Sequence, residues 1–307
     1  MIASISTSVA YSIFGIFCIL IVASLFVFLL KKRNPGKEYA ALTLRIRSWW
    51  IMASIFFVAI ALSRNITLVF LGFVSFLALK EYFSIIPIRR PDRQVLFWVY
   101  LSIPLQFYWV ATGWYGMFII FIPVYLFLFI PFRMTLVGRT ENFLRAAGTI
   151  HWGVMAFVFS ISHVAFLLVL PPQINPVAGG AGLILFLVFL TQFNDVCQYV
   201  WGKTLGKRKI IPKISPNKTW AGFIGGVVTT TVIAFVLAPY LTPMNNLHAI
   251  LAGLIISIAG FIGDVTISAV KRDIGIKDSG SMIPGHGGIL DRVDSLIYTA
   301  PLFFHFL

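Results

Sequence analysis

The chain has 307 residues, of which 59% are hydrophobic and only 11% are charged. So few charged side chains could not cover the surface of a soluble domain of this length, and the composition therefore excludes the ordinary soluble classes. Apolar runs long enough to cross a bilayer recur from end to end, and they predict an all-α, polytopic integral membrane protein. Cys18 and Cys197 both fall in apolar segments and indicate neither a disulfide framework nor a zinc site.

About ten transmembrane helices are expected, because a helix needs ~20 residues to span the hydrocarbon. The first run has no basic residue before it and no clear cleavage site, so it is interpreted as a retained span and not as a signal peptide. The second, third and last runs are short, so the expected number of transmembrane helices is defined only to within one or two. In chain order the runs lie near residues 8–30, 48–63, 66–80, 95–111, 114–132, 151–170, 179–200, 220–238, 248–270 and 293–307.

The formal charge of +14 is concentrated between alternate spans. If the N-terminus lies outside, five connecting segments fall on one side and carry 23 of the 24 lysine and arginine residues, with Arg64 as the exception. The positive-inside rule assigns that side to the cytoplasm, as in a bacterial cytoplasmic membrane. The five basic segments are residues 31–47, 80–94, 133–150, 201–219 and 271–292.

The character of the chain changes near residue 150 and predicts two regions. Residues 1–150 form an N-terminal transmembrane region of aromatic and aliphatic spans. Residues 151–307 form a C-terminal catalytic transmembrane region, in which the loops 201–219 and 271–292 are basic and rich in glycine. Charged side chains within spans are costly and usually functional, so we expect the chemistry in this second region.

Asp264 is the first candidate, because it lies within or at the edge of the apolar run 248–270. A carboxylate at that depth costs several kcal/mol unless it faces water, a cation or a partner. Helical spacing places three further polar residues on the same face, namely Ser268, Lys271 and Arg272. The structural alternative is an internal ion pair of Asp264 with Lys271 or Arg272 that only locks helices together.

A second candidate is the pair Asp291 and Asp294, which lies one helical turn apart just before the last run. Two or three carboxylates with little else around them suit a hard cation such as Mg2+. The structural alternative is that acidic residues are simply favoured at a helix N-terminus. The glycines within 284–288 weaken it, because glycine lets the backbone approach an anion closely. His286, in the same segment, either donates to a phosphate or caps a turn.

The loop 201–219 holds six basic residues and no acidic one. Three interpretations compete: a surface anchor, a site for anionic lipid and a triphosphate site. Ser215, Lys218 and Thr219 favour the third, because they present phosphate donors just before a helix that would begin near Thr219. Asp195, in the seventh run, is a further intramembrane carboxylate. Together these parts indicate phosphate chemistry on a lipid-embedded substrate.

The stretch from Ser268 to Asp294 resembles the signature of the phosphatidate cytidylyltransferase (CDP-diacylglycerol synthase) family. Two further segments are similar to that family, Ser215–Trp220 and the run Asp195-x-x-x-Tyr199-x-x-Gly202, so that the likeness covers about residues 190–294. Departures from the family pattern occur at Asn217, Ala221 and Cys197-Gln198, and they leave the lipid substrate open. The matching signature positions are Ser268, Lys271, Arg272, Lys277, Asp278, Pro284, His286, Gly287, Gly288, Asp291, Arg292 and Asp294.

The resemblance implies that CTP and phosphatidate give CDP-diacylglycerol and pyrophosphate, with Mg2+ required and a monovalent cation as an additional expectation. It implies metal ligation by Asp264 and Asp291, with Asp294 and Asp195 in support. It assigns the CTP phosphates to Ser215, Lys218 and Thr219. It implies that CTP or the lipid phosphate is bound by Lys271, Arg272, Lys277, His286 and Arg292, of which Lys271, Arg272 and His286 are counted with the catalytic aspartates.

Other functions stay open. One is a divergent paralogue that acts on another lipid phosphate, and a second is a CTP-dependent lipid-alcohol kinase, which would release CDP instead of pyrophosphate. A transporter or lipid-binding scaffold would tend to show matched halves with interrupted helices, whereas the polar residues here crowd into one half. Nucleic acid is not an expected partner, because the basic residues follow the topology rule. The oligomeric state is open, with a homo-oligomer as one alternative.

Overall fold

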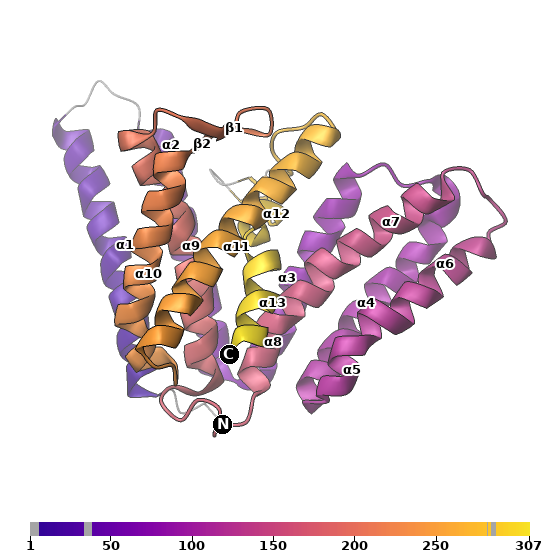
Figure 1. Cartoon of the computed structure of the whole chain (residues 1–307), viewed down its shortest axis with the longest axis horizontal. Helices are drawn as coiled ribbons and strands as arrows, with labels where there is room; N and C mark the ends of the chain where they lie inside the picture. Colours follow the sequence, from indigo (N-terminus) through magenta and orange to yellow (C-terminus); the bar gives the residue numbers. More distant parts are fainter. Residues whose placement is uncertain (1–5, 34–38, 281, 284–286) are drawn as a thin grey trace.

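The computed structural model describes residues 6–33, 39–280, 282–283 and 287–307. These residues form a bundle of long helices, confirming the all-α, polytopic class (Figure 1). Nine helical segments in the described part are long and apolar enough to span a membrane. Seven of them are single helices: α1 (Thr7–Arg33), α2 (Ala40–Leu62), α3 (Arg64–Ile85), α4 (Arg93–Thr112, after a 3-10 turn at Arg90–Asp92), α9 (Gly179–Leu205), α10 (Trp220–Leu241) and α11 (Asn246–Asp273).

The other two spans each contain a π-helical turn. The first consists of α5 (Tyr115–Ile120), a π turn at Phe121–Leu126 and α6 (Phe127–Thr135). The second consists of α7 (Phe143–Val154), a π turn at Met155–Phe159 and α8 (Ser160–Val169). Inserted residues of this kind shift the side chains that follow around the helix axis while the span stays continuous.

The chain ends in two short helices, α12 (Leu290–Val293) and α13 (Leu296–Phe306). The last run, expected as a span over 293–307, is therefore an 11-residue helix. At 1.5 Å per residue it extends only about 16 Å, roughly half of the hydrocarbon thickness. Its inner face is buried at Ile297, Ala300 and Phe303, so it packs as a partial span inside the bundle.

Several predicted boundaries were wrong because charged residues continue the helices. Helix α2 begins at Ala40, so Arg45 and Arg47 lie inside the helix and not in a loop 31–47. Helix α3 runs to Ile85, and α9 runs to Leu205. The loop 201–219 also contains an antiparallel hairpin of β1 (Lys209–Ile211) and β2 (Ser215–Thr219). The expected start of the next helix near Thr219 is confirmed by α10, which that residue caps.

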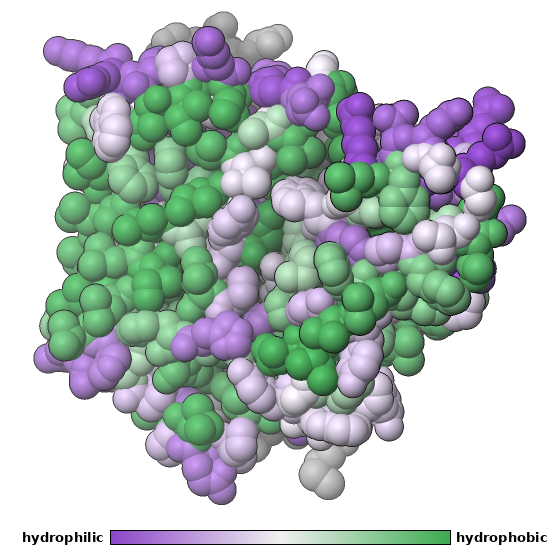
Figure 2. Space-filling model, turned by 45° about the vertical axis from the view of Figure 1, so that its right-hand side comes forward, coloured by the Kyte–Doolittle hydropathy of each residue, from purple (hydrophilic) through white to green (hydrophobic). Residues whose placement is uncertain are grey.

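The described residues of the five basic segments lie at one end of the bundle. Figure 1 shows the end of α1, the α3–α4 and α6–α7 connections, the hairpin and the end of α11 at the upper rim. Figure 2 shows hydrophilic residues along that rim and hydrophobic residues covering the sides below it. This arrangement agrees with the alternation deduced from the charges, and Arg64 lies at the opposite end, where it donates to the Ala111 carbonyl at 3.0 Å.

The buried core crosses residue 150, since fully buried side chains such as Leu79, Ile130, Phe157, Phe186 and Phe303 come from both sides of it. Helices α1 and α2 contribute few buried residues and expose large apolar side chains, as helices at a lipid boundary do. The division of the chain at residue 150 stays a prediction about where the chemistry lies.

Small residues let the second-half helices pack closely. The contacts of α10 with α9 and with α11 are the most extensive among the described elements. A Cβ atom added at Gly253 of α11 would lie 2.7 Å from the Thr231 Cα of α10, which is closer than real contacts allow. Close backbone approach through small residues is the main source of helix association in lipid, where burial of apolar surface contributes little.

We expect Gly253→Leu to destabilise the fold by about 1–3 kcal/mol, because the added side chain must push α10 and α11 apart. The measurement is the thermal unfolding midpoint in detergent. Gly15→Leu in α1 is the matched control, since nothing lies within 4 Å of a Cβ added there. An equal midpoint for both variants would contradict close packing of α10 on α11.

Candidate functional site

The β-hairpin carries Lys218 back toward the helix bundle. The hairpin pairs Lys209 with Thr219, and the Trp220 N–H donates to the Arg208 carbonyl at 3.1 Å. Thr219 then ends the strand and starts α10, because its Oγ1 accepts from the Gly222 N–H at 3.1 Å. This capping bond satisfies one of the free amides of the first helical turn and fixes the direction in which β2 approaches the bundle.

The Lys218 ammonium is held by α9 and α11. Its Nζ lies 2.5 Å from Oδ2 of Asp264 and donates to Oε1 of Gln198 at 3.0 Å. Burial by itself lowers the pKa of Lys218, but the Asp264 and Asp195 carboxylates outweigh it and leave the pKa above its usual value. Lys218 is therefore a stable cation. Asp264 pairs with it, and not with Lys271 or Arg272 as the structural alternative would have it.

Two more carboxylates complete a cluster around this ammonium. Asp195 and Asp294 both act electrostatically on Lys218 together with Asp264. The Ser295 hydroxyl bridges the helices, because it lies 3.1 Å from Oδ2 of Asp195 and 3.2 Å from the Gly260 carbonyl. We call Lys218, Asp195, Asp264 and Asp294 the carboxylate cluster.

The junction of α12 and α13 reaches the carboxylate cluster only because α11 carries a glycine there. A Cβ atom added at Gly263 would lie 2.4 Å from the Asp294 carbonyl oxygen. Asp294 is 9% exposed, and its Oδ1 accepts from the Ser295 N–H at 2.8 Å. Asp294 is thus placed by the backbone that surrounds it, whereas Asp264 keeps 24% of its side chain accessible.

Asp291 lies in a second polar group beside the cluster. Its Oδ1 is 2.6 Å from the Lys271 ammonium, and its Oδ2 accepts from the Ser279 hydroxyl at 2.9 Å and from the Gly288 N–H at 3.3 Å. Burial by itself raises the pKa of Asp291, but Lys271, Ser279 and Gly288 outweigh it and hold the pKa below its usual value. Asp291 is therefore an ionised carboxylate at neutral pH.

Arg292 follows Asp291 in the chain and acts on the carboxylate cluster. Its charge acts on both Asp195 and Asp294, and its carbonyl accepts from Gln192 Nε2 at 3.2 Å. The buried Nε atom of its guanidinium has no hydrogen-bond partner among the described residues. A guanidinium with a free donor beside a cluster of carboxylates can take an anionic oxygen as an additional partner.

The remaining predicted site residues lie at the edge of this region. Arg272 is exposed and donates to the Ile214 and Ile276 carbonyls at 3.2 and 3.0 Å, which tethers the hairpin to the end of α11. Ser215 is partly buried in β2, and Lys277 is exposed beyond α11. His286 falls outside the described residues. The roles assigned to these residues stay predictions.

Sequence reasoning missed Glu81, which belongs to α3 in the first half of the chain. Its Oε2 accepts from the Ile289 N–H at 2.8 Å, so Glu81 contacts the segment that leads to Asp291. The sequence does carry a signal. The predicted span ended at residue 80, but the apolar residues Tyr82, Phe83 and Ile85 follow Glu81, and α3 continues to Ile85. The contact of Gln198 with Lys218 was missed as well, because the Cys197-Gln198 pair was noted only as a departure from the family pattern.

The donor set suits Mg2+ in its chemistry. Among the residues that the structure describes, no three His, Cys, Asp or Glu side chains are grouped to enclose a metal ion. Mg2+ in phosphate enzymes is commonly held by only one or two carboxylates, with waters and substrate phosphates completing its octahedron. Asp264, which is partly accessible, and the neighbouring Asp195 and Asp294 supply oxygen ligands of that kind.

Comparisons with known proteins assign the chain to a family. The sequence profile of the cytidylyltransferase family matches residues 43–307. Uncharacterized protein YnbB of Escherichia coli (strain K12) is 46% identical over 296 residues, covering 96% of this chain and 97% of that protein. Phosphatidate cytidylyltransferases of Haemophilus influenzae and Bacillus subtilis are 42% and 48% identical over 135 and 116 residues, and this chain spans 46% and 42% of their lengths. The chain belongs to the cytidylyltransferase family.

Proposed function

We propose that this protein transfers the cytidylyl group of CTP to a membrane lipid phosphate, with phosphatidate as the substrate and CDP-diacylglycerol and pyrophosphate as the products. The family match and the similarity to two phosphatidate cytidylyltransferases support the reaction class. The observation that carries the proposal is the carboxylate cluster around Lys218 at the basic end of a membrane bundle. Such a cluster offers charge for a phosphate and its counter-ion at the depth of lipid headgroups.

The reaction is an in-line displacement at phosphorus. A phosphate oxygen of the lipid forms a bond to the α-phosphorus of CTP, and the bond from that phosphorus to the bridging oxygen of the β-phosphate breaks. Pyrophosphate leaves with the electron pair, so no redox partner is needed. The protein has little covalent work in such a transfer, and its contribution is to position the two phosphates and neutralise their charge.

Different residues would position the phosphates and neutralise their charge. Lys218 and Arg292 would approach phosphate oxygens, since both are cations placed among the carboxylates. Lys271, held by Asp291, would keep the second polar group ordered beside them. Mg2+, held by Asp264 with Asp195, Asp294 or Asp291, would supply the neutralisation of the triphosphate charge.

The orientation in the membrane is part of the proposal. The basic end of the bundle would face the cytoplasm, where CTP is available, because lysine and arginine favour the inner side. The lipid would enter from the bilayer with its headgroup at the level of the cluster. A bacterial cytoplasmic membrane is the proposed location.

We expect purified protein in phospholipid nanodiscs to release pyrophosphate from CTP when Mg2+ and phosphatidate are present, and to form a CDP-lipid. The assay compares phosphatidate with other lipid phosphates and with a polyprenol, using labelled CTP and thin-layer chromatography. Release of CDP with a phosphorylated alcohol would identify a kinase and contradict the proposal. Product from a different lipid phosphate would correct the substrate and keep the reaction class, whereas no product from any lipid would refute both.

We expect Asp264→Asn to lower kcat at least about 100-fold, because it removes the carboxylate that would hold Mg2+ and that orients Lys218. The control is Asp273→Asn, the same change at an exposed carboxylate in the last turn of the same helix, which should keep the wild-type rate. Thermal unfolding of both variants reports on folding. A near-normal rate for Asp264→Asn would leave the pair with Lys218 as a structural ion pair only.

A further inference from the structure

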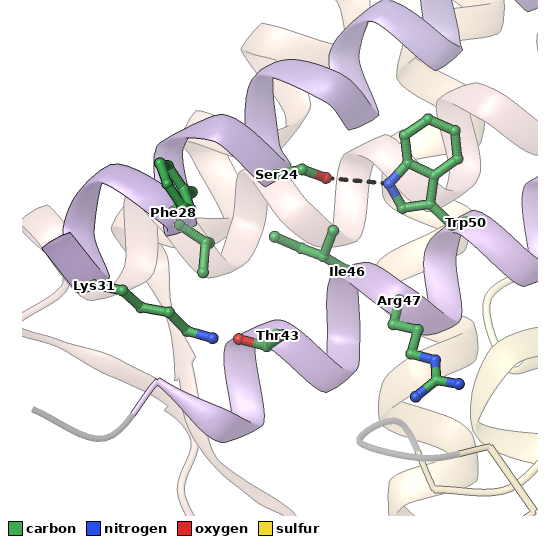
Figure 3. Close-up of a pocket in the computed structure, with 8 residues that line it drawn as sticks. Ser24, Phe28, Lys31, Thr43, Ile46, Arg47 and Trp50 are labelled. Carbon is green, nitrogen blue, oxygen red and sulfur yellow. Dashed lines mark hydrogen bonds between the residues drawn. The ribbon is translucent and has the colours of Figure 1, made fainter.

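A pocket of about 360 Å³ lies between α1 and α2 at the basic end of the bundle. It is lined by the last three turns of α1 and the first three turns of α2, and Figure 3 shows side chains of both helices around it. None of its lining residues belongs to the carboxylate cluster or to the group around Asp291. The pocket is therefore a feature that the proposed transfer reaction does not use.

The wall of the pocket is apolar, and two cations stand beside it. Phe28, Ile46 and Trp50 form much of the wall, and the Trp50 indole N–H donates to Ser24 Oγ at 3.1 Å (Figure 3). Lys31 and Arg47 also line the pocket, without any acidic residue among the lining side chains. Within the described chain, neither cation takes part in a salt bridge.

The depth of the pocket matches a lipid headgroup with the start of its chain. Ser24 and Lys31 are seven residues apart on α1, or about 10 Å along the helix axis. Lys31 begins the basic last turn of α1, and in Figure 3 its ammonium points toward the Thr43 hydroxyl. The cationic end is thus at the membrane surface, and the apolar wall extends from there into the bilayer.

We propose that this pocket binds an anionic glycerophospholipid of the bilayer, with its phosphate at the Lys31 ammonium, Arg47 as a second cation on the rim, and an acyl chain along Phe28, Ile46 and Trp50. Charge complementarity selects an anionic headgroup over a zwitterionic one. The apolar wall selects a lipid over a soluble phosphate. The site does not depend on the proposed transfer reaction.

The test uses Trp50 as the reporter. Wild-type protein and Trp50→Phe are placed in nanodiscs of neutral phosphatidylcholine, and phosphatidylglycerol with brominated chains is added as the quencher. The difference between the two proteins isolates the quenching of Trp50. We expect the double variant Lys31→Gln/Arg47→Gln to need about tenfold more brominated lipid for half-quenching. The matched control is Lys32→Gln/Arg33→Gln, which removes two charges from the same helix end outside the pocket.

Three results would overturn this assignment. Equal quenching by brominated phosphatidylcholine would mean ordinary boundary lipid without selection for charge. An unchanged lipid concentration for half-quenching in the Lys31→Gln/Arg47→Gln variant would show that the two cations do not bind the lipid. Loss of quenching on addition of inorganic phosphate would identify a soluble anion as the occupant.

A separate observation concerns Glu81, whose side chain is buried at 8% exposure below the segment before α12. One oxygen accepts from the Ile289 N–H, and the other, Oε1, is buried without a hydrogen-bond partner among the described residues. Gly288 packs directly on this carboxylate, and an added Cβ there would overlap with Oε1. Gly280 approaches it as well, with an added Cβ 3.4 Å from Oε1.

These contacts connect Glu81 to Asp291 through the backbone. The Gly288 N–H donates to Asp291, and the next N–H along the chain, that of Ile289, donates to Glu81. We infer that Glu81 is a positioning residue, which fixes this turn so that Asp291 accepts from Gly288 and faces Lys271. Its importance for catalysis rests on the proposed function, but its effect on the turn does not.

Hydrogen exchange measured by mass spectrometry tests the turn without an activity assay. We expect Glu81→Ala to speed amide exchange at Ile289 about tenfold, because a charge-assisted hydrogen bond is lost. Glu81→Gln keeps an acceptor oxygen and should restore most of the protection, and Lys80→Ala, an exposed neighbour on α3, should leave it unchanged. Unchanged exchange in Glu81→Ala would overturn the positioning role. If exchange rises in that variant while the wild type has no transferase activity, only the proposed function fails.

Discussion

The pairing of Lys218 with Asp264 is the constraint on which the rest of the second half depends. An ammonium removed from water needs carboxylates, and a carboxylate at the edge of a span needs a cation, so each group is stable there only because of the other. The strand that carries Lys218 must therefore fold back onto α9 and α11. The junction at Asp294 must also approach the same point, and Gly263 is the position that lets it do so.

The three carboxylates of the cluster lie close together in a buried place. Two cations act on them, because Arg292 acts on Asp195 and Asp294 in addition to Lys218. Repulsion between neighbouring carboxylates away from water is costly, and a divalent cation would offset it. This is a physical reason for the proposed Mg2+ at this point of the fold.

The helices could be predicted from the sequence because twenty apolar residues in lipid have few other ways to satisfy their backbone. The partner of Asp264 could not. Helical periodicity reveals only neighbours on the same helix, and it correctly grouped Asp264 with Ser268, which lie within 3.4 Å. Lys218 reaches Asp264 from a hairpin 46 positions earlier in the chain, so that pairing is a property of the tertiary fold. Glu81 was missed for the same reason, because its partner Ile289 is 208 residues away.

The contact between Glu81 and Ile289 also changes the meaning of the two-region division. In sequence motifs, the residues before 150 share with the family only their membrane-spanning character. Helix α3 nevertheless supplies a carboxylate, Glu81, that holds the turn next to Asp291. The family profile begins at residue 43, so it includes α3 and excludes α1. The helices of the first half therefore have different roles. Helix α3 belongs to the framework of the site, and α1 lies outside the matched unit, where it forms one wall of the lipid pocket.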